Sequence, residues 1–208
     1  MNIFSTPVVL IASRFGFAVY FALLFGAHAA AEAQPLAAVV AERVPIVWCL
    51  YLLSMYGACE YIYAAFRRRS IDLVYAFPLV FAIFVLNGVS LLIRGQEEVP
   101  IINRAEHFTS FILLGYIVWV FFLKYLPHDV WDKHPYYTAL LTLSVTSLIG
   151  VGNEIIELIL DSVVGTNTVG VGYDTSLDLL MNTLGSGLFL AVSLILHEGN
   201  ITFTKPKE

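Results

Sequence analysis

The sequence predicts an all-α protein, a polytopic transmembrane helical bundle of six helices with both termini in the cytoplasm. Of the 208 residues, 59% are hydrophobic and 13% are charged, whereas a soluble domain carries roughly 25% charged residues. The mean hydropathy is +0.80, and the chain repeats apolar runs of about 20 residues, the length that a helix needs to cross the hydrocarbon. Strands of a membrane barrel would show short alternating segments instead.

The six runs follow one another without a soluble domain or a linker of low complexity between them, so we expect a single transmembrane domain over residues 1–208. No basic patch exists beyond the loop Arg67–Arg69, which argues against a nucleic-acid partner. In order, the runs cover Val8–Ala30, Val44–Phe66, Ile71–Ile93, Glu106–Leu126, Tyr136–Leu160 and Leu177–Leu196.

The first run has some features of a signal peptide. Arg14 precedes an apolar stretch over residues 15–27, and the segment His28–Ala31 resembles a cleavage site. Residues 2–13 are themselves mostly apolar, unlike the basic segment that opens a signal peptide. We therefore expect an uncleaved first helix.

Several polar residues of the first three runs have a structural interpretation. Arg14 and Glu60 fall toward the cytoplasmic ends of the first two predicted helices, and we favour an ion pair between them over a relay for transport. Asn87 is expected to form a hydrogen bond between helices. Cys49 and Cys59 lie ten residues apart in one run, about 15 Å along a helix axis, which is too far for a disulfide.

The loop Arg67–Arg69 sets the predicted orientation, because positively charged loops stay in the cytoplasm. Alternation of the runs then places the lysines inside as well, namely Lys124, Lys133, Lys205 and Lys207. A set of ionisable residues at the ends of the last three runs comes to the outer face, and it comprises His107, Glu154, Glu157, Asp161, Asp174 and Asp178.

Ionisable groups at membrane depth are costly, so they need a partner, a proton, a metal ion or a water-filled cavity. Glu154, Glu157 and Asp161 are spaced i, i+3, i+7 and share one side of the fifth helix. They lie near its C-terminus, where the helix dipole disfavours negative charge. This placement indicates a binding requirement rather than a contribution to stability.

The other members of the set also have simpler interpretations when each is taken alone. Asp174 suits the N-cap of the sixth helix, and Asp178 complements the positive end of its dipole. A lone His107 near a helix start is usually a hydrogen-bonded interface residue, and Arg104 can serve as an anchor at the lipid headgroups. The functional interpretation depends on the convergence of three distant segments at one face.

Three short motifs appear in this order: Arg104-x-x-His107, Glu154-x-x-Glu157 and Tyr173-Asp174-Thr175-x-x-Asp178. Together they resemble the pattern of the YjdF-like inner-membrane proteins of unknown function. The stretch Asp178–Gly185 resembles the C-terminal signature of the VanZ-like family, named for a teicoplanin-resistance protein. The resemblance covers residues 103–190 and implies a multi-pass protein of the bacterial inner membrane. Asn103 stands where the family pattern has Asp, which weakens a metal or proton role there.

One His with several carboxylates is an oxygen-rich ligand set that suits Mg²⁺, Mn²⁺, Fe²⁺ or Zn²⁺. A divalent metal ion at this face would bind a phosphate-bearing or lipid-linked substrate, or activate water. The predicted catalytic or metal-ligating residues are His107, Glu154, Glu157, Asp174 and Asp178. The residues predicted to bind substrate are Arg104, Asn103 and Asn182.

Three functions remain open from the sequence. The first is cell-envelope or lipid-linked chemistry at the outer site, the second a small proton-coupled transporter, and the third a non-catalytic accessory subunit of a membrane complex. A transporter needs polar residues through the midplane, where the fifth run offers only Thr138, Thr142, Ser144, Thr146 and Ser147. In a static alternative, the acids form a polar network that fixes the last three helices, and small residues such as Gly185 favour their close packing.

Overall fold

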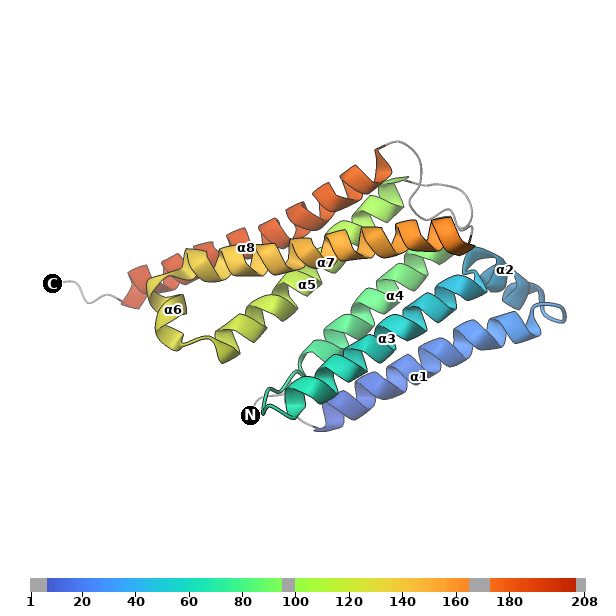
Figure 1. Cartoon of the computed structure of the whole chain (residues 1–208), viewed down its shortest axis with the longest axis horizontal. Helices are drawn as coiled ribbons and strands as arrows, with labels where there is room; N and C mark the ends of the chain where they lie inside the picture. Colours follow the sequence, from blue (N-terminus) through green and yellow to red (C-terminus); the bar gives the residue numbers. More distant parts are fainter. Residues whose placement is uncertain (1–6, 95–99, 165–172, 205–208) are drawn as a thin grey trace. The chain divides into compact units, whose positions relative to one another are not determined.

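The computed structural model describes residues 7–94, 100–164 and 173–204, and most of these residues form helices (Figure 1). The all-α prediction is confirmed. Residues 1–6 lie outside the described residues, as do Lys205 and Lys207. The helices are α1 (Pro7–Ala30), α2 (Pro35–Arg43), α3 (Ile46–Arg67), α4 (Ala76–Arg94), α5 (Pro100–Tyr125), α6 (His128–Lys133), α7 (Pro135–Val164) and α8 (Asp174–Thr204).

Within the described residues, six helices are long and apolar enough to cross a membrane: α1, α3, α4, α5, α7 and α8. These are the six predicted runs with shifted ends. α5 begins at Pro100, a residue type suited to the first helical turn, so Asn103 and Arg104 lie inside the helix rather than ahead of it. The short helices α2 and α6 were not predicted, because each is too short to cross the hydrocarbon.

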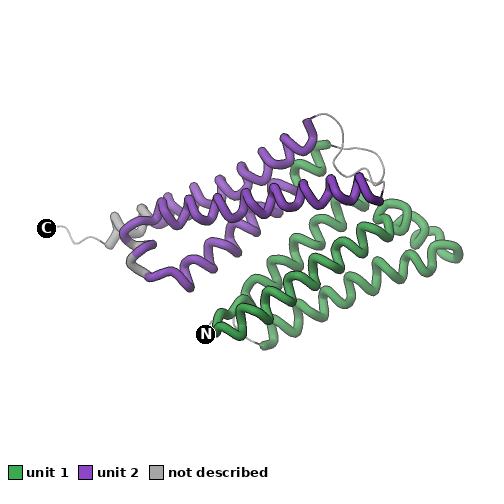
Figure 2. Tube along the Cα trace, viewed as in Figure 1, with its two compact units in different colours: residues 1–106 green, residues 107–208 purple. Residues whose placement is uncertain are grey.

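The chain forms two compact units, residues 1–106 and residues 107–208 (Figure 2). Unit 1 contains α1 to α4 and the first turns of α5. Unit 2 contains the rest of α5 with α6, α7 and α8. That both units belong to a single transmembrane domain stays a prediction, and each unit is described by itself below.

An aromatic core holds α1, α3 and α4 together in unit 1. The ring of Phe17, which is 1% exposed, has its centroid 4.4 Å from that of Tyr56, 5.1 Å from Phe81 and 5.2 Å from Phe84. The contacts with Phe81 and Phe84 are edge-to-face, and such contacts stabilise a core beyond the area they bury. Phe17 therefore anchors the first helix to its two neighbours.

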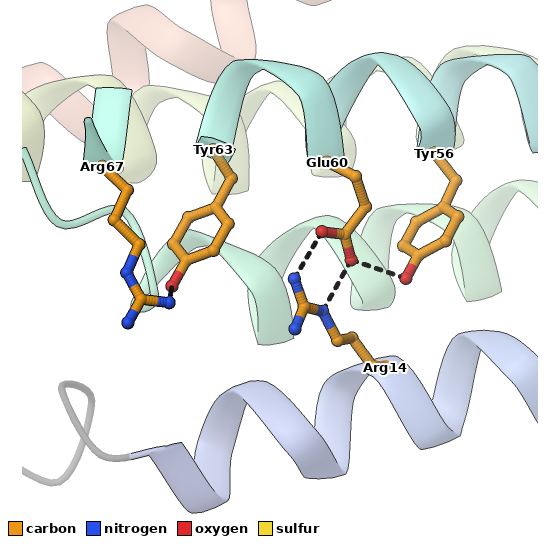
Figure 3. A network of polar contacts seen from close by, with 5 residues as sticks. All are labelled: Arg14, Tyr56, Glu60, Tyr63 and Arg67. Atoms are coloured by element: carbon orange, nitrogen blue, oxygen red, sulfur yellow. Dashed lines mark hydrogen bonds and ion pairs between the residues drawn. The ribbon is translucent and has the colours of Figure 1, made fainter. Parts of the chain in front are cut away.

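An ion pair joins α1 to α3, as the sequence predicted (Figure 3). Both nitrogens of the Arg14 fork donate to Glu60: Nε to Oε1 at 2.8 Å and Nη2 to Oε2 at 2.6 Å. Tyr56 donates its hydroxyl to Oε1 of the same carboxylate at 2.7 Å. Such a bidentate pair fixes the geometry as well as the charge, so this contact has a structural role.

Asn87 forms the interhelical hydrogen bonds expected of it. The indole Nε1 of Trp48 donates to Asn87 Oδ1 at 2.9 Å, and Asn87 Nδ2 donates to Glu106 Oε1 at 3.0 Å. These bonds connect α3, α4 and the first turns of α5. The prediction of unpaired cysteines is also confirmed, since Cys49 and Cys59 are free thiols.

In unit 2, α8 packs closely against α5 and α7. A Cβ atom added at Gly185 would collide with the backbone carbonyl of Phe108, so only glycine allows the two backbones to approach this closely. One residue further on, the hydroxyl of Ser186 donates to the carbonyl oxygen of Phe111 at 3.2 Å. This close packing brings the start of α8 within reach of His107.

Candidate metal site

A row of buried positions winds along α7 and leads to the predicted site. Each member follows the previous one by about one helical turn. The row consists of Thr138, Thr142, Thr146, Gly150, Glu154 and Glu157, all of which are buried. The two glutamates therefore point into protein, as the cost of a carboxylate facing lipid requires.

The threonines of this row bear on the transporter alternative. Thr142 donates its hydroxyl to the carbonyl oxygen of Thr138 at 2.8 Å, and Thr146 donates to that of Thr142 at 3.0 Å. These hydroxyl protons are therefore used within α7 itself, so these two side chains suit helix packing. Transport stays a prediction without support from this row.

Three of the predicted residues meet in unit 2: His107 from α5, Glu154 from α7 and Asp178 from α8. One ligand atom from each, an imidazole nitrogen and two carboxylate oxygens, all lie within 4.8 Å of one another, and all three residues are buried. We call these three residues the buried cluster. Its members come from three helices and are separated by 47 and 24 residues in sequence.

Each ring nitrogen of His107 has its own neighbour. Nδ1 lies 3.0 Å from Oδ1 of Asn182. Nε2 lies 3.7 Å from Oδ2 of Asp178. Since an amide oxygen only accepts hydrogen bonds, Nδ1 carries the proton in this arrangement. The lone pair of Nε2 in the neutral ring then lies on the side of the Asp178 carboxylate.

The carboxylate of Glu154 is the most unusual group of the buried cluster. The residue is 6% exposed, and among the described residues neither carboxylate oxygen accepts a hydrogen bond. The side chains of Asn153 and Thr175 approach it closely enough to interact, but within the described part of the chain both oxygens lack a donor at hydrogen-bond distance and angle. A buried acceptor without a hydrogen-bond donor lowers the stability of the fold by roughly 1–3 kcal/mol. A cation or a water molecule next to this carboxylate would remove that cost.

Glu157 lies next to the buried cluster rather than in it. It is 7% exposed, and its Oε1 accepts a hydrogen bond of 2.7 Å from Nδ2 of Asn153. Sequence reasoning missed Asn153, although its position four residues before Glu157 places the two side chains on one side of the helix. Asn153 thus satisfies one carboxylate oxygen of Glu157 with a hydrogen bond.

The remaining predicted site residues are not members of the buried cluster. Asp174 is in the first turn of α8, one turn before Asp178, and is not one of the three residues of the cluster. Asn103 and Arg104 belong to unit 1, so their predicted roles in substrate binding stay predictions. Asn182 contacts His107, and its predicted role in substrate binding stays a prediction.

The three residues of the buried cluster are of types that could hold a metal ion. One imidazole nitrogen and two carboxylate oxygens suit divalent ions such as Mn²⁺, Fe²⁺ or Zn²⁺. Three protein ligands leave at least one position for water or substrate, as in catalytic zinc sites. The Glu154 oxygens, which accept no hydrogen bond from the described residues, could act as ligands. The hydrogen bond at Nδ1 of His107 is of the kind that usually orients a metal-ligating histidine.

The comparison with protein families identifies the kind of protein to which this site belongs. The model of a family described as "Predicted membrane protein (DUF2238)" matches residues 12–199. The match covers all six apolar helices in whole or in large part. No curated protein and no solved structure matches the chain.

Proposed function

We propose that this chain, which belongs to the DUF2238 family of predicted membrane proteins, holds a divalent metal ion at one end of its helices. The ligands are His107, Glu154 and Asp178. The site lies at the outer face of the bacterial inner membrane, and it acts on a phosphate-bearing, lipid-linked substrate of the cell envelope.

One observation carries the metal site. An imidazole nitrogen and two carboxylate oxygens from three helices lie within 4.8 Å of one another in a buried environment, and the Glu154 oxygens have no hydrogen-bond donor among the described residues. Two buried carboxylates side by side repel each other unless a proton or cation lies between them. A divalent ion would neutralise both.

The substrate class follows from the chemistry of an open metal position in a membrane. A bound divalent ion polarises a phosphoryl oxygen and stabilises its developing charge. A substrate that reaches such a site from the lipid phase needs an acyl or polyprenyl part. The resemblance of residues 103–190 to the YjdF-like and VanZ-like families supports the envelope setting and the inner-membrane location.

Two glutamates one turn apart provide a matched test of the metal site. Glu154→Gln removes a proposed ligand, whereas Glu157→Gln changes a carboxylate that already accepts a hydrogen bond from Asn153. Titration of the purified protein with Co²⁺, followed by visible absorption, should show binding in the wild type and in Glu157→Gln and none in Glu154→Gln. Equal binding by both variants would remove Glu154 from the site.

The substrate proposal has its own test. The protein is reconstituted in vesicles that contain a polyprenyl diphosphate, and release of inorganic phosphate is measured with Mn²⁺ or with a chelator. We expect release that requires both the metal ion and Glu154. Metal binding without any phosphate release would retain the site and refute the substrate.

A further inference from the structure

We propose that Asn182 is a positioning residue that holds His107 in the tautomer whose Nε2 faces the buried cluster. This inference rests on the proposed metal site, because a metal ion binds the unprotonated nitrogen of a neutral imidazole. The geometry on which it rests concerns only the residues of unit 2.

The first observation is the hydrogen bond itself. Asn182 Oδ1 and His107 Nδ1 are 3.0 Å apart, although 75 residues separate them in the chain. Asn182 is 1% exposed and His107 is 9% exposed, so solvent does not compete for this bond. Because the amide oxygen can only accept, the bond stabilises the tautomer that carries its proton on Nδ1.

The second observation is the direction of the other nitrogen. Nε2 of the same ring lies 3.7 Å from Asp178 Oδ2, on the side where the ligand atoms of the buried cluster meet. Asp178 and Asn182 are four residues apart on α8, so they occupy the same side of that helix. One helix therefore supplies both the partner of Nδ1 and a carboxylate beside Nε2.

The third observation explains how Asn182 is itself held in place. Its Nδ2 lies against Gly150 of α7, where an added Cβ atom would stand 3.0 Å from that nitrogen and 3.2 Å from the ring of Phe111. The bare backbone of Gly150 thus allows α7 to press on the amide. A larger residue there would displace Asn182 from His107.

The tautomer can be measured without any metal ion, which separates this inference from the proposed function. We would record ¹⁵N NMR of metal-free protein labelled at histidine, and assign the His107 signals by difference from the His107→Gln variant. We expect a protonated Nδ1 and a bare Nε2 in the wild type. Asn182→Leu should move the proton to Nε2, while Asn182→Asp, whose ionised carboxylate accepts and cannot donate, should retain it on Nδ1.

Two glycines of α7 provide a second route that leaves Asn182 intact. In Gly150→Ala the new Cβ atom would stand 3.0 Å from Nδ2 of Asn182, whereas an added Cβ atom at Gly152 has no neighbour within 4 Å. We expect Gly150→Ala to shift the His107 proton as Asn182→Leu does, and Gly152→Ala to leave it on Nδ1. This pair keeps the inference testable if Asn182→Leu fails to fold.

A second experiment measures the affinity of the same variants for Co²⁺. Removal of a partner that supports a metal-ligating histidine typically weakens binding 10–100-fold, so we expect at least about a tenfold loss in Asn182→Leu and near wild-type affinity in Asn182→Asp. A proton on Nε2 in the wild type, or an unchanged tautomer in both Asn182→Leu and Gly150→Ala, would overturn the inference. A wild type with the expected tautomer that binds no Co²⁺ would overturn the metal site and leave the positioning role intact.

Discussion

Nε2 of His107 and Oδ2 of Asp178 lie 3.7 Å apart in a buried environment. The separation leaves room for both atoms to bind one ion between them, since metal–ligand bonds of about 2.0–2.2 Å to nitrogen and oxygen are usual for zinc. The same two groups would attract each other directly if the imidazole were protonated. The effect of an Asp178 substitution on metal affinity tests the metal-binding role.

Asp178→Asn should lower the affinity for Co²⁺ by at least about tenfold, because metal sites depend strongly on each ligand and its support. Asp174→Asn is the matched control, since Asp174 lies one turn earlier on α8 and outside the buried cluster. Isothermal titration calorimetry of both variants measures the difference. Loss of affinity in Asp174→Asn with none in Asp178→Asn would show that the ligands are assigned wrongly.

The close approach of α8 to α5 predicts a large effect from one methyl group. Gly185→Ala should lower the free energy of unfolding by about 1–3 kcal/mol, the usual cost of forcing extra volume into a packed core. Gly187→Ala adds the same group where nothing lies within 4 Å, and it should be neutral or slightly stabilising. Thermal unfolding in detergent, followed by tryptophan fluorescence, measures both. A Gly185→Ala variant as stable as Gly187→Ala contradicts the packing described for α5 and α8.

The pair Arg14–Glu60 should couple α1 to α3 energetically. The side chains are 42% and 26% exposed, so solvent weakens the attraction, and we expect a coupling of about 1 kcal/mol in a double-mutant cycle with Arg14→Gln and Glu60→Gln. Arg14→Lys keeps the charge without the planar fork and should recover only part of it. Additive effects of the two single substitutions would mean that the pair contributes nothing to stability.

The orientation of the chain is a prediction from the loop Arg67–Arg69 and can be tested with reporters. A reporter fused at Glu208 should behave as cytoplasmic, and one inserted near Gly170 as external. The physical reason is the retention of positively charged loops in the cytoplasm. The reverse pattern would place the buried cluster at the cytoplasmic face and exclude envelope chemistry at the outer surface.

Much of the fold followed from the sequence because the relevant signals are local. The six apolar runs are long enough to cross the hydrocarbon, and α7 begins at Pro135, one residue before the predicted fifth run. The short helix α6, over His128–Lys133, was not predicted. Its six residues lack the apolar periodicity that identifies a helix.

The candidate site was predictable in part, for a related physical reason. Spacing within one helix placed Glu154 and Glu157 on a shared side, and both are buried. Spacing says nothing about which residues of different helices touch. The contacts of His107 with Asn182 and Asp178 depend on the close packing of α8 at Gly185, which only the three-dimensional structure reveals.

Metal analysis of the purified protein with and without His107 tests the central claim most directly. Wild-type protein and His107→Ala are incubated with Mn²⁺ and Zn²⁺, desalted and measured by mass spectrometry of the elements, with Thr183→Val on the exposed side of α8 as the control. We predict about one metal ion per chain in the wild type and the control, as a single three-ligand site requires, and almost none in a His107→Ala variant that elutes as folded protein. A wild type without metal, or a His107→Ala variant with the same metal content, would contradict the account.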